Sequence, residues 1–267
     1  KLGGEKRVMS IMFCDVRGFT AISEALKTKP EKLTEVINVL LTHLSKDILD
    51  CKGTIDKYMG DCIMAFWNAP LINKNHPEDA IESARKMMLT MAEVNKIVQK
   101  SGDIDFDLKI GIGVGTGECV VGNMGSDQRF DYTVLGDVVN LSSRLEGQTK
   151  SYGVTTIISS NTYSKVKNDI GDIIELDKIQ VKGKTEPETI FGLFNNKISS
   201  EERKNQESFL EAYKNGDYSK SSAHLKSLID LEENLASYAS LMQDRIKLYE
   251  KDGFPDNWDG VFIATDK

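Results

Sequence analysis

Two carboxylates stand where apolar strands would meet turns that contain glycine. Asp15 follows the apolar run 8–14, and Asp61 lies between Gly60 and the apolar run 62–67. If a sheet brings the two side chains together, they can hold divalent cations over a polyphosphate, because Mg²⁺ is usually bound by carboxylates together with substrate phosphates. The pattern predicts phosphoryl or nucleotidyl chemistry.

A second candidate group combines an amide with a guanidinium. In a helix that begins at Asp137, Asn140 and Arg144 are four positions apart and share one face. Such a pair can bind a sugar and a phosphate, although a solvated helix face explains it equally well. Lys182, in the turn Lys182-Gly183-Lys184, could also reach a phosphate, but a plain basic turn is the commoner meaning of such a motif.

Glycines recur through residues 111–117. Their spacing is not that of the dinucleotide-binding fingerprint G-x-G-x-x-G, and no helix follows directly. Glycine in a strand also lets another backbone approach closely. We therefore interpret this run as a closely packed strand rather than as a cofactor loop.

The elements that would carry these side chains are hairpins and long helices, which favour an α+β fold with helices packed on a mainly antiparallel sheet. Strands are predicted at 8–14, 53–58, 62–67, 106–116, 119–124, 155–159, 173–181 and 189–194, and helices at 31–50, from Pro77 onward and at 137–149. Residues 199–252 are charged and helix-prone, which predicts a small helical extension. We place the boundary between residues 1–196 and 197–267.

The bulk properties are those of an ordinary globular protein. The 267 residues are 40% hydrophobic and 28% charged, which suits one large domain or one domain with an appendage. The net charge of −7 argues against a nucleic-acid-binding surface. The four cysteines match no zinc or Cys-x-x-Cys spacing, which favours reduced thiols in a cytosolic domain.

Five motifs, taken together and in order, resemble the class III nucleotide cyclase catalytic domain over about residues 5–195. They are FCDVRGFT, DKYMGD, IGIGVGTGECVVGNMG, YTVLGDVVNLSSRL and VKGK. The resemblance implies a ferredoxin-like cyclase homology domain. It also implies two divalent metal ions, Mg²⁺ or Mn²⁺, bound by Asp15, Asp61 and the carbonyl of Val16. The turn that would hold the β- and γ-phosphates through its backbone amides corresponds to Gly18, Phe19 and Thr20.

The same resemblance implies roles for the remaining polar residues. Lys57 matches the lysine that reads the adenine edge, and Thr133 occupies the second base-reading position. Asn140 and Arg144 match the pair that orients the ribose and stabilises the transition state, and Lys182 matches a lysine that contacts the terminal phosphates. Threonine at the second base-reading position resembles the subgroup called class IIIb, some members of which respond to bicarbonate.

Hydrogen-bond chemistry favours ATP over GTP. Lys57 can donate to the ring nitrogen of adenine, and the Thr133 hydroxyl can accept from its amino group. Guanine has the reversed pattern and would prefer a carboxylate at the lysine position. The predicted activity is conversion of ATP to 3′,5′-cyclic AMP and pyrophosphate. The alternatives are a guanylate cyclase, a non-catalytic nucleotide-binding regulatory domain and, least favoured, an RNA-binding module.

In the family that the chain resembles, the active site lies between two catalytic domains. One would supply Asp15 and Asp61, and the other would supply Lys57, Thr133, Asn140, Arg144 and Lys182. Because one chain carries both sets, we expect a two-fold homodimer with two equivalent sites.

The ends of the chain suggest further parts. The chain starts at Lys1 in the manner of a piece of a longer protein. Gly216-Asp217-Tyr218, Tyr249 and 256–261 resemble the tail of bacterial cyclases that carry a CHASE-type sensor and membrane helices upstream. We therefore expect a cytoplasmic catalytic domain in a membrane-anchored protein.

Overall fold

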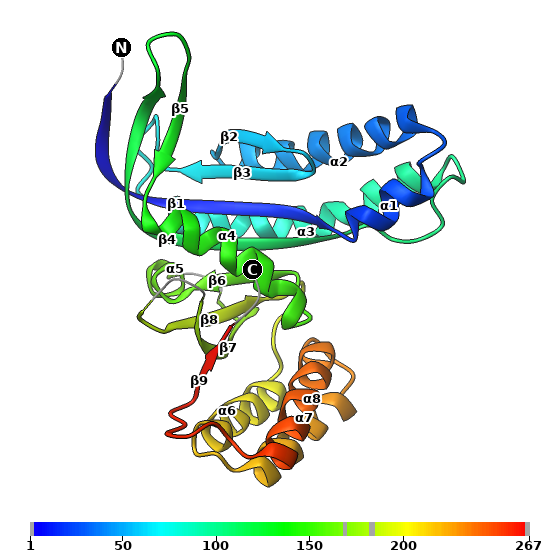
Figure 1. The fold of residues 1–267 in the computed structure, drawn as a ribbon, viewed down its shortest axis with the longest axis vertical. Coiled ribbons are helices and arrows are strands. Elements are labelled where there is room, and N and C mark those ends of the chain that lie inside the picture. Colours follow the sequence, from blue (N-terminus) through cyan, green and yellow to red (C-terminus); the bar gives the residue numbers. More distant parts are fainter. Residues whose placement is uncertain (1–2, 168–169, 182–184, 265–267) are drawn as a thin grey trace.

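The structure is a computed structural model that describes residues 3–167, 170–181 and 185–264. Its centre is a nine-stranded sheet in these residues, with the order β2-β3-β1-β4-β6-β8-β7-β9 and with β5 also paired to β4 (Figure 1). The strands are β1 (Gly3–Arg17), β2 (Thr54–Met59), β3 (Cys62–Trp67), β4 (Lys109–Gly125), β5 (Phe130–Leu135), β6 (Thr156–Ser159), β7 (Ile173–Gln180), β8 (Glu188–Leu193) and β9 (Val261–Ile263). Only the β4–β6 and β7–β9 pairs are parallel, so the predicted, mainly antiparallel sheet is confirmed.

The helices of the catalytic part are packed on this sheet. They are α1 (Phe19–Ala25), α2 (Pro30–Asp50), α3 (His76–Gln99), α4 (Asp137–Ser151) and α5 (Ser160–Lys165). Residues of α2 and α3 share a hydrophobic core with one face of β1, β3 and β4. The methionines that recur along α3, including Met87 and Met91, lie in this core, as their helical spacing predicts.

The opposite face of the sheet has a smaller core of its own. Alternate side chains of β1 divide between the two faces, since Met12 packs with the helices while Ile11 and Phe13 face the other way. Val134 of β5 and Val138 at the start of α4 cover this second face. Thr133 of β5, 77 positions after Asp56 of β2, donates a hydrogen bond to the Asp56 carboxylate.

Some elements differ from the prediction. The two strands predicted at 106–116 and 119–124 are one strand, β4, because Gly117 and Glu118 continue the antiparallel pairing with Met9 and Val8 of β1. Strand β1 is correspondingly longer than the apolar run 8–14. The sequence analysis also missed α1, β5 and α5, which are short and carry weak periodic signals.

The C-terminal extension is helical, as predicted, and comprises α6 (Ser200–Lys214), α7 (Tyr218–Asp230) and α8 (Ala236–Asp252). It ends in β9, which pairs with β7, and its helices share a hydrophobic core with the neighbouring part of the catalytic fold. Arg245 of α8 donates to Asp177 of β7 at 2.7 Å, and Asp177 also accepts from the Tyr152 hydroxyl. No helix in the described part of the chain combines the length and apolar character of a membrane span.

Candidate active site

The two predicted metal-binding aspartates lie side by side. Asp15 is near the end of β1, and Asp61 is in the turn between β2 and β3, where Gly60 adopts φ 66°. The pairing of Cys14 with Ile63 brings the two positions together. Burial, the charge of Asp15 and a hydrogen bond between the two carboxyl groups raise the pKa of Asp61 to about 6. Two carboxylates held this closely repel each other unless a proton or a cation lies between them.

The donor set at this place fits hard divalent cations. Carboxylate oxygens are preferred ligands of Mg²⁺, which usually needs only one or two of them. No group of three or more His, Cys, Asp or Glu side chains in the described part of the chain is arranged to hold a metal ion. A cation here would therefore depend on Asp15 and Asp61 together with backbone, water or substrate oxygens.

Glu146 is a third carboxylate beside this pair, and the sequence analysis missed it. Burial and the charges of Asp15 and Asp61 raise its pKa to about 7, against the opposing charge of Arg17. The one feature of the sequence that could have pointed to Glu146 is its position two residues after Arg144, in the same helix α4. The cluster thus concentrates negative charge in a partly desolvated place, which favours binding of cations.

The predicted phosphate turn follows directly. Gly18 has φ 68° and precedes α1, so the chain turns sharply after Arg17. Glycine adopts this left-handed backbone conformation readily, because glycine has no Cβ to clash with the backbone. Phe19 and Thr20 form the first turn of this short helix and are half-buried and exposed, respectively. The backbone amides at this point are close in sequence to Asp15, as the predicted site requires.

The two residues predicted to read the base meet through a residue that the sequence analysis did not single out. The Thr133 hydroxyl donates to Asp56 Oδ2 at 2.6 Å, and Lys57 Nζ lies 3.3 Å from Asp56 Oδ1. The side chain of Asp56 is fully buried, whereas that of Lys57 is 42% exposed. The structure therefore gathers Lys57 and Thr133 around one buried carboxylate.

Helix α4 carries Asn140 and Arg144 on one side, with Asn140 exposed and Arg144 half-buried. Its close approach to β4 depends on the glycine run, as the sequence predicted. A Cβ added at Gly113 would lie 2.2 Å from the carbonyl oxygen of Ser142 and 2.3 Å from the amide nitrogen of Glu146. Only glycine permits that contact, because neither backbone atom can move independently of α4.

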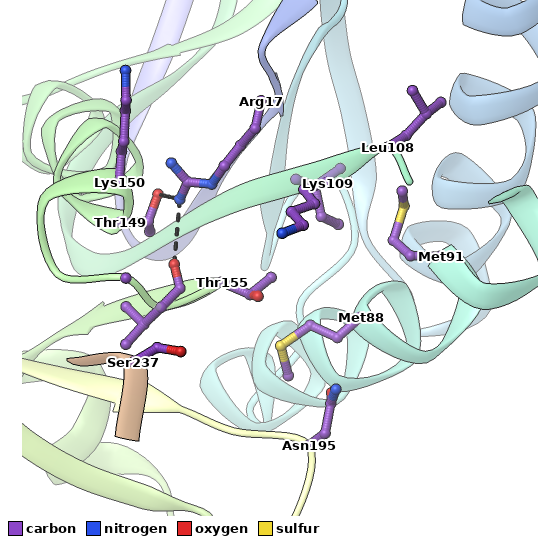
Figure 2. Close-up of a pocket in the computed structure, with 13 residues that line it drawn as sticks. Arg17, Met88, Met91, Leu108, Lys109, Thr149, Lys150, Thr155, Asn195 and Ser237 are labelled. Carbon is purple, nitrogen blue, oxygen red and sulfur yellow. Dashed lines mark hydrogen bonds between the residues drawn. The ribbon is translucent and has the colours of Figure 1, made fainter. Parts of the chain in front are cut away.

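The predicted site residues form separate groups within one chain. Among the described residues, no hydrogen bond or ion pair joins Asp15 or Asp61 to Thr133 or Arg144. Lys182 falls outside the described residues. A cavity of about 510 Å³ lies elsewhere, between α3, the end of α4 and α8, and Figure 2 shows Arg17 and Lys109 beside it. Its lining contains none of the predicted site residues, so this cavity does not enclose the predicted site.

Known proteins are similar to this chain in sequence and fold. The family model of the adenylate and guanylate cyclase catalytic domain matches residues 4–193. An adenylate cyclase of Anabaena cylindrica is 35% identical over 189 residues, covering 69% of this chain and 36% of that protein. This chain therefore spans about a third of that relative's length.

Two solved structures are similar in fold and sequence. The adenylyl cyclase CyaB from P. aeruginosa has a TM-score of 0.64 and 35% identity, covering 73% of this chain and 98% of that chain. The guanylyl cyclase Cya2 also has a TM-score of 0.64, with 33% identity, and covers 74% of this chain and 96% of that chain. Since the family model spans most of the sequence, the chain belongs to the family of adenylate and guanylate cyclase catalytic domains.

Proposed function

We propose that this chain converts ATP to 3′,5′-cyclic AMP and pyrophosphate. The observation that carries the proposal is the Asp15–Asp61 pair, in which burial and mutual repulsion raise the pKa of Asp61 to about 6. This pair lies beside a glycine turn whose amides can face phosphates. Such a place is suited to a polyphosphate that arrives with divalent cations.

The first group of residues would bind the metal ions and the terminal phosphates. Asp15, Asp61 and the Val16 carbonyl would hold two metal ions, Mg²⁺ or Mn²⁺, which when bound supply charge neutralisation and a more acidic ribose 3′-hydroxyl. The amides of the turn at Gly18, with Phe19 and Thr20, would hold the β- and γ-phosphates. The bond that forms joins the 3′-oxygen to the α-phosphorus, and the bond that breaks joins the α-phosphorus to the bridging oxygen of the departing pyrophosphate. The proton of the 3′-hydroxyl passes to solvent or to a substrate phosphate.

The second group of residues would act on the sugar and the α-phosphate. Asn140 would hold the ribose so that its 3′-oxygen faces the α-phosphorus, which converts binding energy into correct orientation. Arg144 would stabilise the negative charge that develops on the α-phosphate in the transition state. Lys182 would contact the terminal phosphates.

We further propose that the site is completed by a second copy of the chain. This arrangement is supported by the candidate site itself, where no hydrogen bond or ion pair between described residues joins the aspartate pair to Thr133 or Arg144. In a two-fold homodimer, the aspartates of one protomer would face Lys57, Thr133, Asn140 and Arg144 of its partner, and two equivalent sites would result.

Guanylate cyclase activity is the second candidate, since the guanylyl cyclase Cya2 is 33% identical to this chain. The overall similarity therefore does not distinguish the two substrates. Lys57 and Thr133 favour adenine, because they present a donor and an acceptor in the order that its edge requires. A non-catalytic nucleotide-binding role is less favoured, since the described part of the chain retains both aspartates, Asn140 and Arg144.

The sequence resemblance also suggests how the activity is regulated and where the domain is located. We propose a cytoplasmic catalytic domain attached to upstream sensor and membrane segments, and bicarbonate as a candidate activator. Both proposals come from the sequence resemblance alone. Activity measurements with and without bicarbonate, at constant pH, would test the second.

The direct test is product analysis. The purified chain is incubated with ATP or GTP and with Mg²⁺ or Mn²⁺, and the cyclic nucleotide is identified by chromatography. We expect cyclic AMP from ATP, less cyclic GMP from GTP, and no product in EDTA. Exclusive formation of cyclic GMP would support the guanylate cyclase alternative. The absence of both cyclic products would contradict cyclase activity.

A further inference from the structure

A β-bulge places Asp56 where a regular strand would not. Ile55 pairs with Ala65 and Lys57 pairs with Met64, so Asp56 is an extra residue in β2 without a partner on β3. Bulges re-aim side chains, and they often occur near active sites. Here the bulge lets the neighbouring side chains of Asp56 and Lys57 approach the same region, instead of pointing to opposite faces of the sheet.

The bulged residue, Asp56, accepts the hydrogen bond of the Thr133 hydroxyl. An ionised carboxylate can only accept hydrogen bonds, so the single hydroxyl proton of Thr133 is used in the 2.6 Å bond to Asp56 Oδ2. The remaining lone pairs of the hydroxyl oxygen can only accept. Asp56 itself is fully buried, and its Oδ1 has no hydrogen-bond partner among the described residues, while the Lys57 ammonium lies 3.3 Å away and offsets its charge.

We propose that Asp56 is a positioning residue that sets the choice of purine by locking Thr133 as a hydrogen-bond acceptor. This inference rests on the proposed function, in which Lys57 and Thr133 face the base. Adenine offers an amino donor to the locked oxygen and a ring nitrogen to Lys57. Guanine offers an acceptor oxygen and a ring N–H at the corresponding positions, so both contacts fail. A threonine alone carries no such preference, because a free hydroxyl can rotate to donate or to accept.

The test removes the acceptor and follows the selectivity. In Asp56→Leu, which has a similar volume and no polar atom, the hydroxyl can turn and donate to guanine. We expect the ratio of kcat/KM for ATP to that for GTP to fall about tenfold, because an unsatisfied buried polar contact costs roughly that much. The change should appear mainly in KM. Asp50→Ala, which removes an exposed carboxylate paired with Lys46, is the matched control and should keep the wild-type ratio.

A double-mutant cycle separates positioning from general support of the fold. Thr133→Val removes the hydroxyl, so Asp56→Leu should cause no further change in selectivity in that background. A merely structural role predicts the same proportional loss for ATP and GTP, and additive effects in the double variant. Either result would overturn the proposal.

Two further measurements keep the outcome decisive. If Asp56→Leu does not fold, as judged by circular dichroism and thermal unfolding, Asp56→Ala also removes the acceptor and takes its place. Equilibrium displacement of a fluorescent ATP analogue by ATP and by GTP measures the same selectivity without turnover. Absence of cyclic product with a retained ATP preference that Asp56→Leu abolishes would contradict the cyclase activity and support the role of Asp56. An unchanged preference in the binding measurement would refute that role.

Discussion

At the scale of single residues, the candidate site depends on charges placed where little water can reach them. Asp61 and Glu146 both have raised pKa values, about 6 and about 7, because burial and neighbouring carboxylates disfavour their charged forms. A cation that binds between them relieves this repulsion.

The first prediction concerns the aspartate pair. Asp15→Ala or Asp61→Ala should abolish metal-dependent turnover while the fold remains intact, because each change removes a proposed metal ligand whose side chain is not part of the hydrophobic core. In EDTA, Asp61→Asn should unfold at the same temperature as the wild type or a higher one, since the repulsion is gone. Mg²⁺ or Mn²⁺ should raise the unfolding temperature of the wild type more than that of the variant.

Those measurements have clear contrary outcomes. Near-normal cyclase activity in purified Asp15→Ala or Asp61→Ala would exclude the two-metal assignment. Equal stabilisation of wild type and Asp61→Asn by the metal would show that cations bind elsewhere.

Base choice gives the second prediction. Lys57→Glu should reduce kcat/KM for ATP about tenfold or more, because a carboxylate repels the ring-nitrogen acceptor of adenine and a lost polar contact costs ~1–3 kcal/mol. The loss for GTP should be smaller, since its ring N–H and amino group can both donate to glutamate. Full conversion is not expected while Thr133 remains an acceptor. An unchanged ATP-to-GTP ratio would mean that Lys57 does not read the base.

At the scale of elements, the position of α4 depends on its contact with β4. Gly113 and Gly115 provide the space, and the buried Ser142 of α4 lies next to both glycines. The helix that carries Asn140 and Arg144 is thus held to the strand that pairs with β1, which carries Asp15. The relative position of the two candidate groups follows from this packing.

Gly113→Ala tests that contact. The added Cβ would lie 2.2 Å from a backbone oxygen of α4, so the helix must shift. We expect a loss of ~1–3 kcal/mol in the free energy of unfolding and a larger proportional loss of kcat than of nucleotide affinity. Gly171→Ala is the matched control, because its nearest neighbour would be a lysine side-chain carbon at 3.6 Å. Chemical denaturation should show little change there, and equal effects at the two positions would contradict the packing argument.

At the scale of the whole molecule, the extension braces the end of α4. Arg245 of α8 reaches Asp177 and lies 5.1 Å from the ring centroid of Tyr152, the residue that ends α4. The Asp177 side chain is 1% exposed, so loss of Arg245 would leave an uncompensated buried charge. The extension is therefore part of the same packed structure as the catalytic fold.

The proposed sharing of sites between two protomers leads to a complementation prediction. Asp61→Ala and Arg144→Ala should each be nearly inactive alone, since every site in either homodimer lacks one essential group. Mixing the two variants should restore activity, because one of the two sites in each heterodimer is complete. Subunit exchange is followed with differently tagged copies. Exchange without recovery of activity would disprove the shared site.

The sequence by itself determined the family, the three long helices and the β2–β3 hairpin of the catalytic part, and the order of the candidate motifs. These features depend on local signals, such as the apolar stripe of α3, its start at Pro77, and aspartates that follow apolar runs. The residue types and their hydrophobic period are sufficient to predict these features, because each signal lies within one element.

Only the tertiary structure decided which residues of different elements lie in contact. Nothing local shows that β4 continues through Gly117, that Glu146 lies beside Asp15, or that a bulge turns Asp56 toward Thr133. Each contact joins residues far apart in the chain, and its consequence depends on burial. The alternation of apolar residues along a strand shows which side of the strand faces the core, but it does not show which other strand is its neighbour. The charges of the site and its hydrogen-bond directions therefore emerge only when the sheet has formed.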